Sequence, residues 1–291
     1  LYHRAGLPAF VPFFAALLRG VPDLLSPDFP SESRREIRDE VVSAAFRTAP
    51  RRPREAEAVY SDVGFIILGE ILAHVLGVPL DVAFDEELAR PLGLDLRYHR
   101  LSQLTPDDRE GVAPTGLTRP REPAPGQEGM WDRALEVESL PGEVDDDNAW
   151  VLDGVAGHAG LFGTAREVAR FGQLVLEELD GANRIAAAPL WMRALAVDPR
   201  IPGSSRAMGF DTPSAAEGQV SSAGQWIGNL PPGAVGHLGF TGVSLWIDRA
   251  RSLVVALCSN RTYNGRANTR IRDFRPRFHD AVVESLGLVA R

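Results

Sequence analysis

The feature that most constrains the fold is an alternating apolar pattern near the C-terminal end of the chain. Within VGHLGFTGVSLWID, residues 235–248, every second residue from Val243 onward is aliphatic. A period of two predicts a strand with one buried face. A second strand is predicted over 253–259, after the short segment RARS. The two strands predict an antiparallel hairpin that the chain enters through a run of glycines.

Helices are predicted over much of the remaining chain. The clearest is SDVGFIILGEILAHVLG, where Ser61 can cap the N-terminus and Gly77 the C-terminus. Residues 105–147 are rich in Pro, Gly, Asp and Glu and are predicted as a long loop. Further helices are expected at about 82–89, from Thr164 onward and at about 270–286. Helices followed by an antiparallel hairpin and a closing helix predict an α+β fold.

Composition narrows the function classes. The 291 residues carry a formal net charge of −8 and no basic stripe with interleaved aromatic residues, which argues against a nucleic-acid partner. The apolar segment AFVPFFAALLRG contains Pro12 and is far short of the ~20 residues that span a membrane, so we expect a buried helix or loop there. Cys258 is the only cysteine, cannot form an internal disulfide, and is predicted to lie in the core of the second strand.

The common catalytic and metal-binding motifs are absent from the sequence. There is no G-x-S-x-G, H-E-x-x-H, phosphate-binding loop or paired C-x-x-C, and the six histidines are not spaced for a local metal site. We therefore expect no metal and no cofactor. All 31 basic residues are arginine, because the chain contains no lysine.

Two short motifs could carry chemistry. YSD, residues 60–62, stands at the start of the clearest helix, where a phenol and a carboxylate could face a cleft, although an ordinary helix cap has the same residues. In GHLGFTG, residues 236–242, the glycines would let backbone N–H groups approach a ligand, as an oxyanion hole requires. A bulge or a tight strand corner explains these glycines equally well.

In chain order these stretches resemble the serine β-lactamase and penicillin-binding-protein superfamily, specifically its class C-like branch, which includes D,D-peptidases and carboxyl esterases. HRAGLPAF resembles the segment after the nucleophile helix, and YSDVGFIILGEIL resembles the tyrosine motif. DGVAGHAGLFGTAREVARF resembles the glycine-rich turn with its following helix. GHLGFTGVSLWID and LVVALCSNR resemble the third motif and the sheet hairpin, so that the similarity runs from about His3 to Asp280.

The resemblance implies a fold and a division into domains. We expect an antiparallel sheet flanked by helices, together with a mostly helical domain. Residues 1–205 would form the helical domain, and residues 206–291 the C-terminal part of the sheet domain.

The resemblance also implies site residues. Tyr60 and His237 would be catalytic, with His237 in the place of the lysine that the family usually has in its third motif. Asp62, Gly239 and Phe240 would bind the substrate. The N–H of Phe240 would be an oxyanion donor worth roughly 3 to 4 kcal/mol of transition-state stabilisation.

The chain departs from the family in its first motif. That motif, serine, two residues, lysine, cannot be present in a chain without lysine. We therefore expect a fragment from which the nucleophile helix and the early strands of the sheet are absent. Such a chain should be nearly inert, because loss of the nucleophile of a serine hydrolase costs on the order of 10⁶ in turnover.

Two further departures bear on the substrate. His237 is mostly neutral at pH 7 and cannot replace the permanent charge that a lysine offers to a substrate carboxylate. Asp62 stands where the family usually has asparagine, and an ionised carboxylate cannot donate a hydrogen bond to an amide carbonyl. Both changes favour esters over β-lactams and peptides.

Three functions therefore stay open. The first is a serine hydrolase that acts through an acyl-enzyme on a small-molecule acyl ester or a β-lactam, with the ester favoured. The second is a non-catalytic homologue that keeps the cleft for binding, and the third is a D,D-peptidase acting on cell-wall peptides. His158 is expected to make a structural hydrogen bond to the backbone. Asn260 and Arg261 either line the cleft or close a turn. The sequence predicts neither oligomeric state nor compartment.

Overall fold

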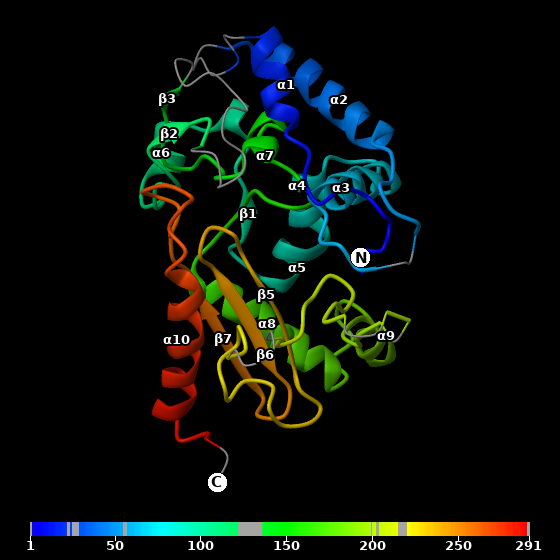
Figure 1. Cartoon of the computed structure of the whole chain (residues 1–291), viewed down its shortest axis with the longest axis vertical. Coiled ribbons are helices and arrows are strands. Elements are labelled where there is room, and N and C mark those ends of the chain that lie inside the picture. The colour runs from blue at the N-terminus through cyan, green and yellow to red at the C-terminus, as the bar shows by residue number, and fades with distance from the viewer. Residues whose placement is uncertain are drawn as a thin grey trace.

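The computed structural model describes residues 2–21, 24, 29–54, 57–121, 136–198, 200–201, 204–214 and 220–289. Helices gather at one end of the molecule and the main sheet at the other (Figure 1). The helical end contains α1 (Phe13–Gly20), α2 (Ser31–Arg47), α3 (Asp62–Leu76), α4 (Leu80–Phe84), α5 (Arg90–Leu92), β1 (Arg97–Tyr98), α6 (Pro106–Arg109), β2 (Thr118–Arg119), β3 (Val137–Glu138), α7 (Asp147–Val151) and β4 (Leu161–Phe162). The sheet end contains α8 (Ala165–Leu179), α9 (Ala188–Ala194), β5 (Ala234–Leu238), β6 (Ser244–Asp248), β7 (Leu253–Leu257) and α10 (Ile271–Ser285).

The main sheet has the order β5-β6-β7 in the described part of the chain, and both strand pairs are antiparallel. In the β6–β7 pair Ser244 faces Leu257 and Asp248 faces Leu253, so the predicted hairpin is confirmed. The prediction for Cys258 is wrong. Because β7 ends at Leu257, Cys258 follows the strand and is exposed instead of lying in the core.

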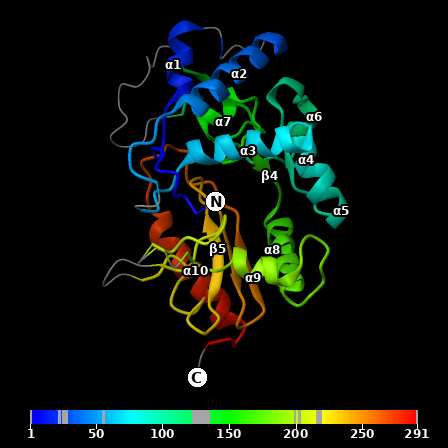
Figure 2. The same cartoon turned by 90° about the vertical axis from the view of Figure 1, so that its right-hand side faces the viewer.

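Both faces of β6 are buried, which corrects the prediction of a single buried face. Helix α8 covers the face that carries Ile247, and α10 covers the face that carries Trp246 (Figure 2). Ser244 can be buried because its hydroxyl forms a hydrogen bond with Nε2 of His279 at 3.0 Å. Asp248 can be buried because its carboxylate accepts a hydrogen bond from the Arg251 guanidinium at 2.7 Å. The polar residues of the alternating pattern are therefore paired inside the protein.

Helix α3 begins and ends as predicted. The Ser61 hydroxyl accepts from the Gly64 N–H at 3.1 Å, and Gly77 ends the helix with φ 73°. The inner side packs with α1, α2 and α7 into the core of the helical end, where Ile66 is 1% exposed. The outer side stays exposed and is apolar, with Ile71, Leu72, Val75 and Leu76.

The remaining helices agree with the sequence in kind and differ in their ends. The helix expected at about 82–89 is longer, because a π-helical turn, Asp85–Ala89, joins α4 to α5 through Leu92. The region predicted as a long loop contains α6, β2 and β3, while residues 122–135 lie outside the described residues. None of the described helices is long and apolar enough to cross a membrane alone; α3 and Leu80–Leu92 pass that test only together, bent by 75°.

The α+β fold class is confirmed. The domain boundary between residues 205 and 206 stays a prediction. Helix α8 precedes that boundary in the sequence, yet it packs against β6 and β7.

Candidate active site

Tyr60 and His237 meet where the helical end adjoins the sheet. Tyr60 immediately precedes the Ser61 cap of α3, and His237 is near the end of β5. Their ring centroids lie 5.8 Å apart. Tyr60 is 38% exposed, so a small molecule can reach it. The two side chains predicted to be catalytic therefore lie close together.

His3 is a third member of this site, which the sequence did not identify. Its ring stacks on Tyr60 with a centroid distance of 4.4 Å and on Phe65 with a distance of 5.0 Å. The backbone N–H of Ser61 donates to Nδ1 of His3 at 3.0 Å. The segment HRAGLPAF was matched to the family as a whole, and a sequence pattern gives no sign that its histidine would reach the tyrosine motif.

Arg206 supplies a permanent positive charge beside Tyr60. Its guanidinium carbon lies 5.2 Å from the Tyr60 ring centroid, and it forms an ion pair with Asp211 at 3.0 Å. Asp211 pairs with Gly236 of β5 through an isolated bridge, which brings Arg206 to the edge of the sheet. The sequence gave no signal for Arg206, because it lies in an irregular segment rich in proline, glycine and serine.

Burial sets the protonation of the aromatic groups in the site. Burial and, to a smaller extent, the charge of Asp62 raise the pKa of Tyr60 to about 12, with Arg206 opposing the rise. Burial and, to a smaller extent, the charge of Arg206 lower the pKa of His3 to about 4. The pKa of His237 is lowered by the same two causes. At pH 7 the site therefore presents a neutral phenol and two neutral imidazoles.

Asp62 is the first residue of α3, and the charges of His158 and Asp146 act on it. Burial raises the pKa of Asp62 to about 6, with His158 opposing the rise and Asp146 adding to it. His158 lies 3.0 Å from Asp146, measured from Nε2 to Oδ1, and Asp146 also accepts from the Ala149 N–H at 2.8 Å. Burial opposes the charged form of His158, but the Asp146 carboxylate raises its pKa. The expected structural hydrogen bond of His158 thus goes to a side chain and not to the backbone.

The glycines at the end of β5 are explained by close packing. A Cβ atom at Gly236 would overlap the carbonyl oxygen of Leu245 and the ring of Trp246, and one at Gly239 would overlap the side chain of Val243. The Gly239 N–H donates to the Val243 carbonyl at 2.8 Å and closes the turn into β6. Within the described residues, the N–H of Phe240 makes no hydrogen bond.

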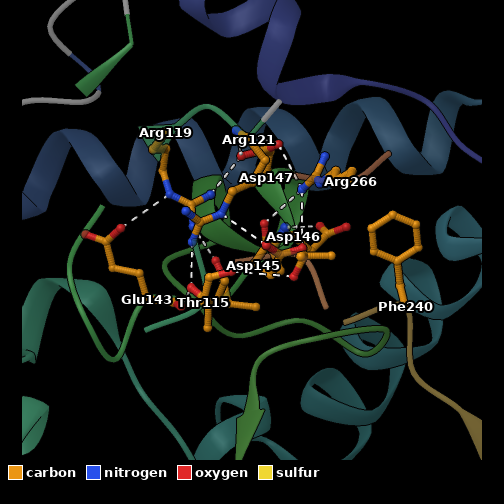
Figure 3. A network of polar contacts seen from close by, with 12 residues as sticks. Thr115, Arg119, Arg121, Glu143, Asp145, Asp146, Asp147, Phe240 and Arg266 are labelled. Atoms are coloured by element: carbon orange, nitrogen blue, oxygen red, sulfur yellow. Dashed lines mark hydrogen bonds and ion pairs between the residues drawn. The ribbon is translucent and has the colours of Figure 1, made fainter. Parts of the chain in front are cut away.

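A network of buried charges borders this turn (Figure 3). Asp147 accepts from the Arg119 guanidinium at 2.7 Å, and Arg266 approaches the same carboxylate to 3.3 Å. Arg121 forms an ion pair with Asp145 at 3.1 Å. The network joins β2 and the residues just after it, the residues at the start of α7, and the segment between β7 and α10. Because its members are distant in the sequence, the pattern of residues did not reveal it.

Arg266 connects the network to Phe240. Its guanidinium carbon lies 5.7 Å from the centroid of the Phe240 ring, and that of Arg261 lies 4.3 Å from it. Phe240 is nevertheless 54% exposed. Arg261 therefore contacts the turn that carries Phe240, and whether it also lines the cleft stays a prediction. In the part of the chain that the structure describes, no group of three or more His, Cys, Asp or Glu side chains could hold a metal ion.

The match to known proteins decides the family. The family model described as Beta-lactamase matches residues 1–275. The chain belongs to the beta-lactamase family. Among relatives of this beta-lactamase-family chain is the N-acetylmuramyl-L-alanine amidase of Bacillus subtilis (strain 168), which is 27% identical over 271 residues, covering 90% of this chain and 55% of the amidase.

A second curated relative and a solved structure are also similar to the beta-lactamase-family chain. A putative D-alanyl-D-alanine carboxypeptidase of Salmonella heidelberg (strain SL476) is 24% identical over 280 residues, covering 93% of this chain and 58% of that protein. The solved structure of the octameric penicillin-binding protein homologue from Pyrococcus abyssi aligns with a TM-score of 0.61 at 14% identity, covering 99% of this chain and 55% of that one. The predicted superfamily is thus confirmed. The chain spans 55 to 58% of the length of the two curated relatives.

Proposed function

We propose that this chain contributes Tyr60, His237 and the Gly239–Phe240 turn to the active site of a serine hydrolase that works through an acyl-enzyme. The observation that carries the proposal is the 5.8 Å approach of the Tyr60 and His237 rings. Phe240 follows β5, the strand that carries His237, by two residues. Its N–H makes no hydrogen bond within the described residues, which supports a role as an oxyanion donor.

The serine and its lysine would come from a part of the protein outside these 291 residues. The serine oxygen would attack the acyl carbonyl carbon, and its proton would pass through the lysine and Tyr60 to the leaving alcohol. Water would then attack the acyl-enzyme, which releases the acid and restores the serine. Because burial raises the pKa of Tyr60 to about 12, its side chain can accept a proton only when a nearby cation lowers that pKa and favours the phenolate. This need is consistent with a lysine close to Tyr60 in the complete site.

The favoured substrate is a small-molecule acyl ester. Asp62 has a pKa of about 6 and is mostly ionised at pH 7, so it accepts hydrogen bonds and does not donate one to an amide carbonyl. An ester places no N–H or amide carbonyl against this carboxylate. The three neutral rings at the site also suit an uncharged acyl group.

Arg206 favours a second candidate, an amidase or peptidase whose substrate carries a carboxylate. His237 cannot supply a permanent charge, but Arg206 lies 5.2 Å from the Tyr60 ring and is partly exposed. A substrate carboxylate could share the guanidinium with Asp211. The names of the relatives from Bacillus and Salmonella are consistent with this candidate.

A pair of chromogenic substrates tests the proposal. A protein that contains this chain together with its serine–lysine motif should hydrolyse a chromogenic acyl ester faster than a chromogenic cephalosporin. Tyr60→Phe should lower kcat on the order of 10²-fold or more, because it removes the proton relay. Tyr263→Phe is the matched control, since Tyr263 is exposed and is not one of the proposed site residues, and should leave kcat unchanged.

The 291-residue chain alone should turn over neither substrate. Hydrolysis of a D-alanyl-D-alanine peptide in preference to the ester would favour the second candidate. Absence of turnover in the protein that carries the serine–lysine motif would rule out both enzymatic readings and leave a binding homologue.

A further inference from the structure

Arg275 is a buried guanidinium without a counterion. It lies on α10, is 7% exposed, and forms no ion pair within the described residues. One of its terminal nitrogens donates to the carbonyl oxygen of Gly239 and, at 2.7 Å, to that of Val243. Its Nε has no hydrogen-bond partner in the described part of the chain. Since an unpaired buried charge is costly, its position against this turn calls for a physical reason.

Arg261 contacts the same turn. Its Nε donates to the carbonyl oxygen of Phe240 at 2.6 Å, and its backbone N–H donates to the Thr241 carbonyl at 2.8 Å. Arg261 also has no ion pair among the described residues. Two arginines thus bind successive carbonyl groups of the turn that joins β5 to β6.

The carbonyl of Gly239 and the N–H of Phe240 belong to one peptide group. A charged donor on the carbonyl oxygen draws electron density from the peptide and makes its N–H a stronger hydrogen-bond donor. Burial, with a smaller contribution from the charge of Arg261, lowers the pKa of Arg275 to about 10, so the guanidinium keeps its charge at pH 7. The positive charge therefore acts through the peptide whose N–H is free.

We propose that Arg275 is a positioning residue that holds and polarises the Gly239–Phe240 peptide, so that its N–H stabilises negative charge on a bound acyl group. Arg261 does the same for the next peptide, whose N–H belongs to Thr241. The proposal rests on the proposed function for its role in turnover. The polarisation itself does not depend on turnover and can be measured in the resting protein.

Amide hydrogen exchange measures this polarisation directly. Base-catalysed exchange of an exposed amide becomes faster as the N–H becomes more acidic. In Arg275→Gln the exchange of the Phe240 N–H, followed by NMR in the 291-residue chain, should slow by about tenfold. This is the change expected when the pKa of the amide N–H rises by about one unit. Arg275→Lys should recover most of the rate, because it keeps the charge. Arg277→Gln, the same change at an exposed position of α10, should have no effect.

The two arginines provide an internal cross-check. Arg261→Gln should slow exchange at Thr241 more than at Phe240, whereas Arg275→Gln should do the opposite. If Arg275→Gln does not fold, the Arg261→Gln result alone tests polarisation of the turn. Unchanged exchange at Phe240 in a folded Arg275→Gln protein would overturn the proposal, and so would equal slowing at both amides in both variants.

Turnover gives the second measurement in a protein that also has the serine–lysine motif. Arg275→Gln should lower kcat for an oxygen ester by about tenfold with KM unchanged, short of the roughly 10²–10³-fold loss expected when an oxyanion donor is removed. The loss should be smaller for the matching thionoester, because sulfur is the weaker hydrogen-bond acceptor. Equal losses for both substrates would mean that Arg275 only supports the fold. If neither substrate is hydrolysed, the proposed function fails while the exchange result still decides the role of Arg275.

Discussion

The imidazole of His3 stacks on the ring of Tyr60 at a centroid distance of 4.4 Å. Its Nδ1 accepts a hydrogen bond from the backbone N–H of Ser61, the residue after Tyr60. Because Nδ1 is the acceptor, the proton of the neutral ring lies on Nε2. One side chain thus holds both the phenol and the cap of α3.

Replacing His3 with alanine should destabilise the fold. The variant loses a stacked ring pair and leaves the Ser61 N–H without its acceptor. Together these losses should lower the free energy of unfolding by roughly 2 kcal/mol. Urea unfolding at pH 7 measures this. His74→Ala, an exposed position of α3, should change the free energy of unfolding by less than about 0.5 kcal/mol. Equal effects of the two variants would contradict the role assigned to His3.

The contribution of His3 should depend on pH. Burial, followed by the charge of Arg206, lowers the pKa of His3 to about 4, whereas the unfolded chain keeps the ordinary value of 6.5. Between pH 6.5 and 4 the unfolded chain binds a proton that the folded chain rejects, so this stability is present above pH 6.5 and declines as pH falls. The difference between wild type and His3→Ala should therefore be smaller at pH 4.5 than at pH 7.5. A constant difference would show that His3 does not titrate in this way.

Asp62→Asn should stabilise the protein at neutral pH. Burial raises the pKa of Asp62 to about 6, with His158 opposing this and Asp146 adding to it, so the folded state disfavours the ionised carboxylate. The folded chain then binds more protons than the unfolded chain between about pH 4 and 6, and wild type loses stability as pH rises through that range. The variant should melt higher than wild type at pH 7.5 and converge with it near pH 4. Asp107→Asn, on exposed α6, is the control and should show no such convergence.

Asp147 should be essential to the buried network in Figure 3. Its carboxylate accepts from Arg119, which is 1% exposed, and lies 3.3 Å from Arg266. Asp147→Leu leaves these guanidinium groups underpaired and should cost about 3–5 kcal/mol in unfolding free energy. The double variant with Arg119→Met should lose less than the sum of the two single changes. Strict additivity in chemical denaturation would argue against a coupled pair.

Gly236→Ala should be among the most damaging single-methyl changes. The new Cβ would overlap the Leu245 carbonyl oxygen and the Trp246 ring across the β5–β6 pair, and backbone cannot move aside as a flexible side chain can. We expect the free energy of unfolding to fall by roughly 3 kcal/mol. Gly20→Ala at the end of α1 meets open space and should be neutral or slightly stabilising. Thermal unfolding of the pair tests whether strand contact, and not the added methyl group as such, is responsible.

Patterns among neighbouring residues predicted the helices and strands. The features that the sequence did not predict depend on contacts between residues far apart in the chain. The Ser61 and Gly77 caps of α3 depend on neighbouring residues and were predicted correctly. The alternation in β6 predicted a strand but gave the wrong burial, because the hydrogen-bond partner of Ser244, His279, lies on α10.

The residues of the candidate site are also brought together by contacts between distant parts of the chain. Tyr60 and His237 were paired only through the family resemblance, since no spacing in the chain relates a helix cap to a late strand. His3 and Arg206 join them through stacking and through a bridge to β5, which depend on tertiary structure. Their roles in catalysis stay proposals.

The position of Cys258 has a practical consequence. As the only thiol, exposed directly after β7, it accepts a single maleimide dye or spin label without any mutagenesis. Its neighbour Ser259 donates to the carbonyl of Gly242 at 2.7 Å, so a probe attached there would sit beside the turn that carries Phe240. Fluorescence or paramagnetic broadening from that one point could follow ligand arrival in real time.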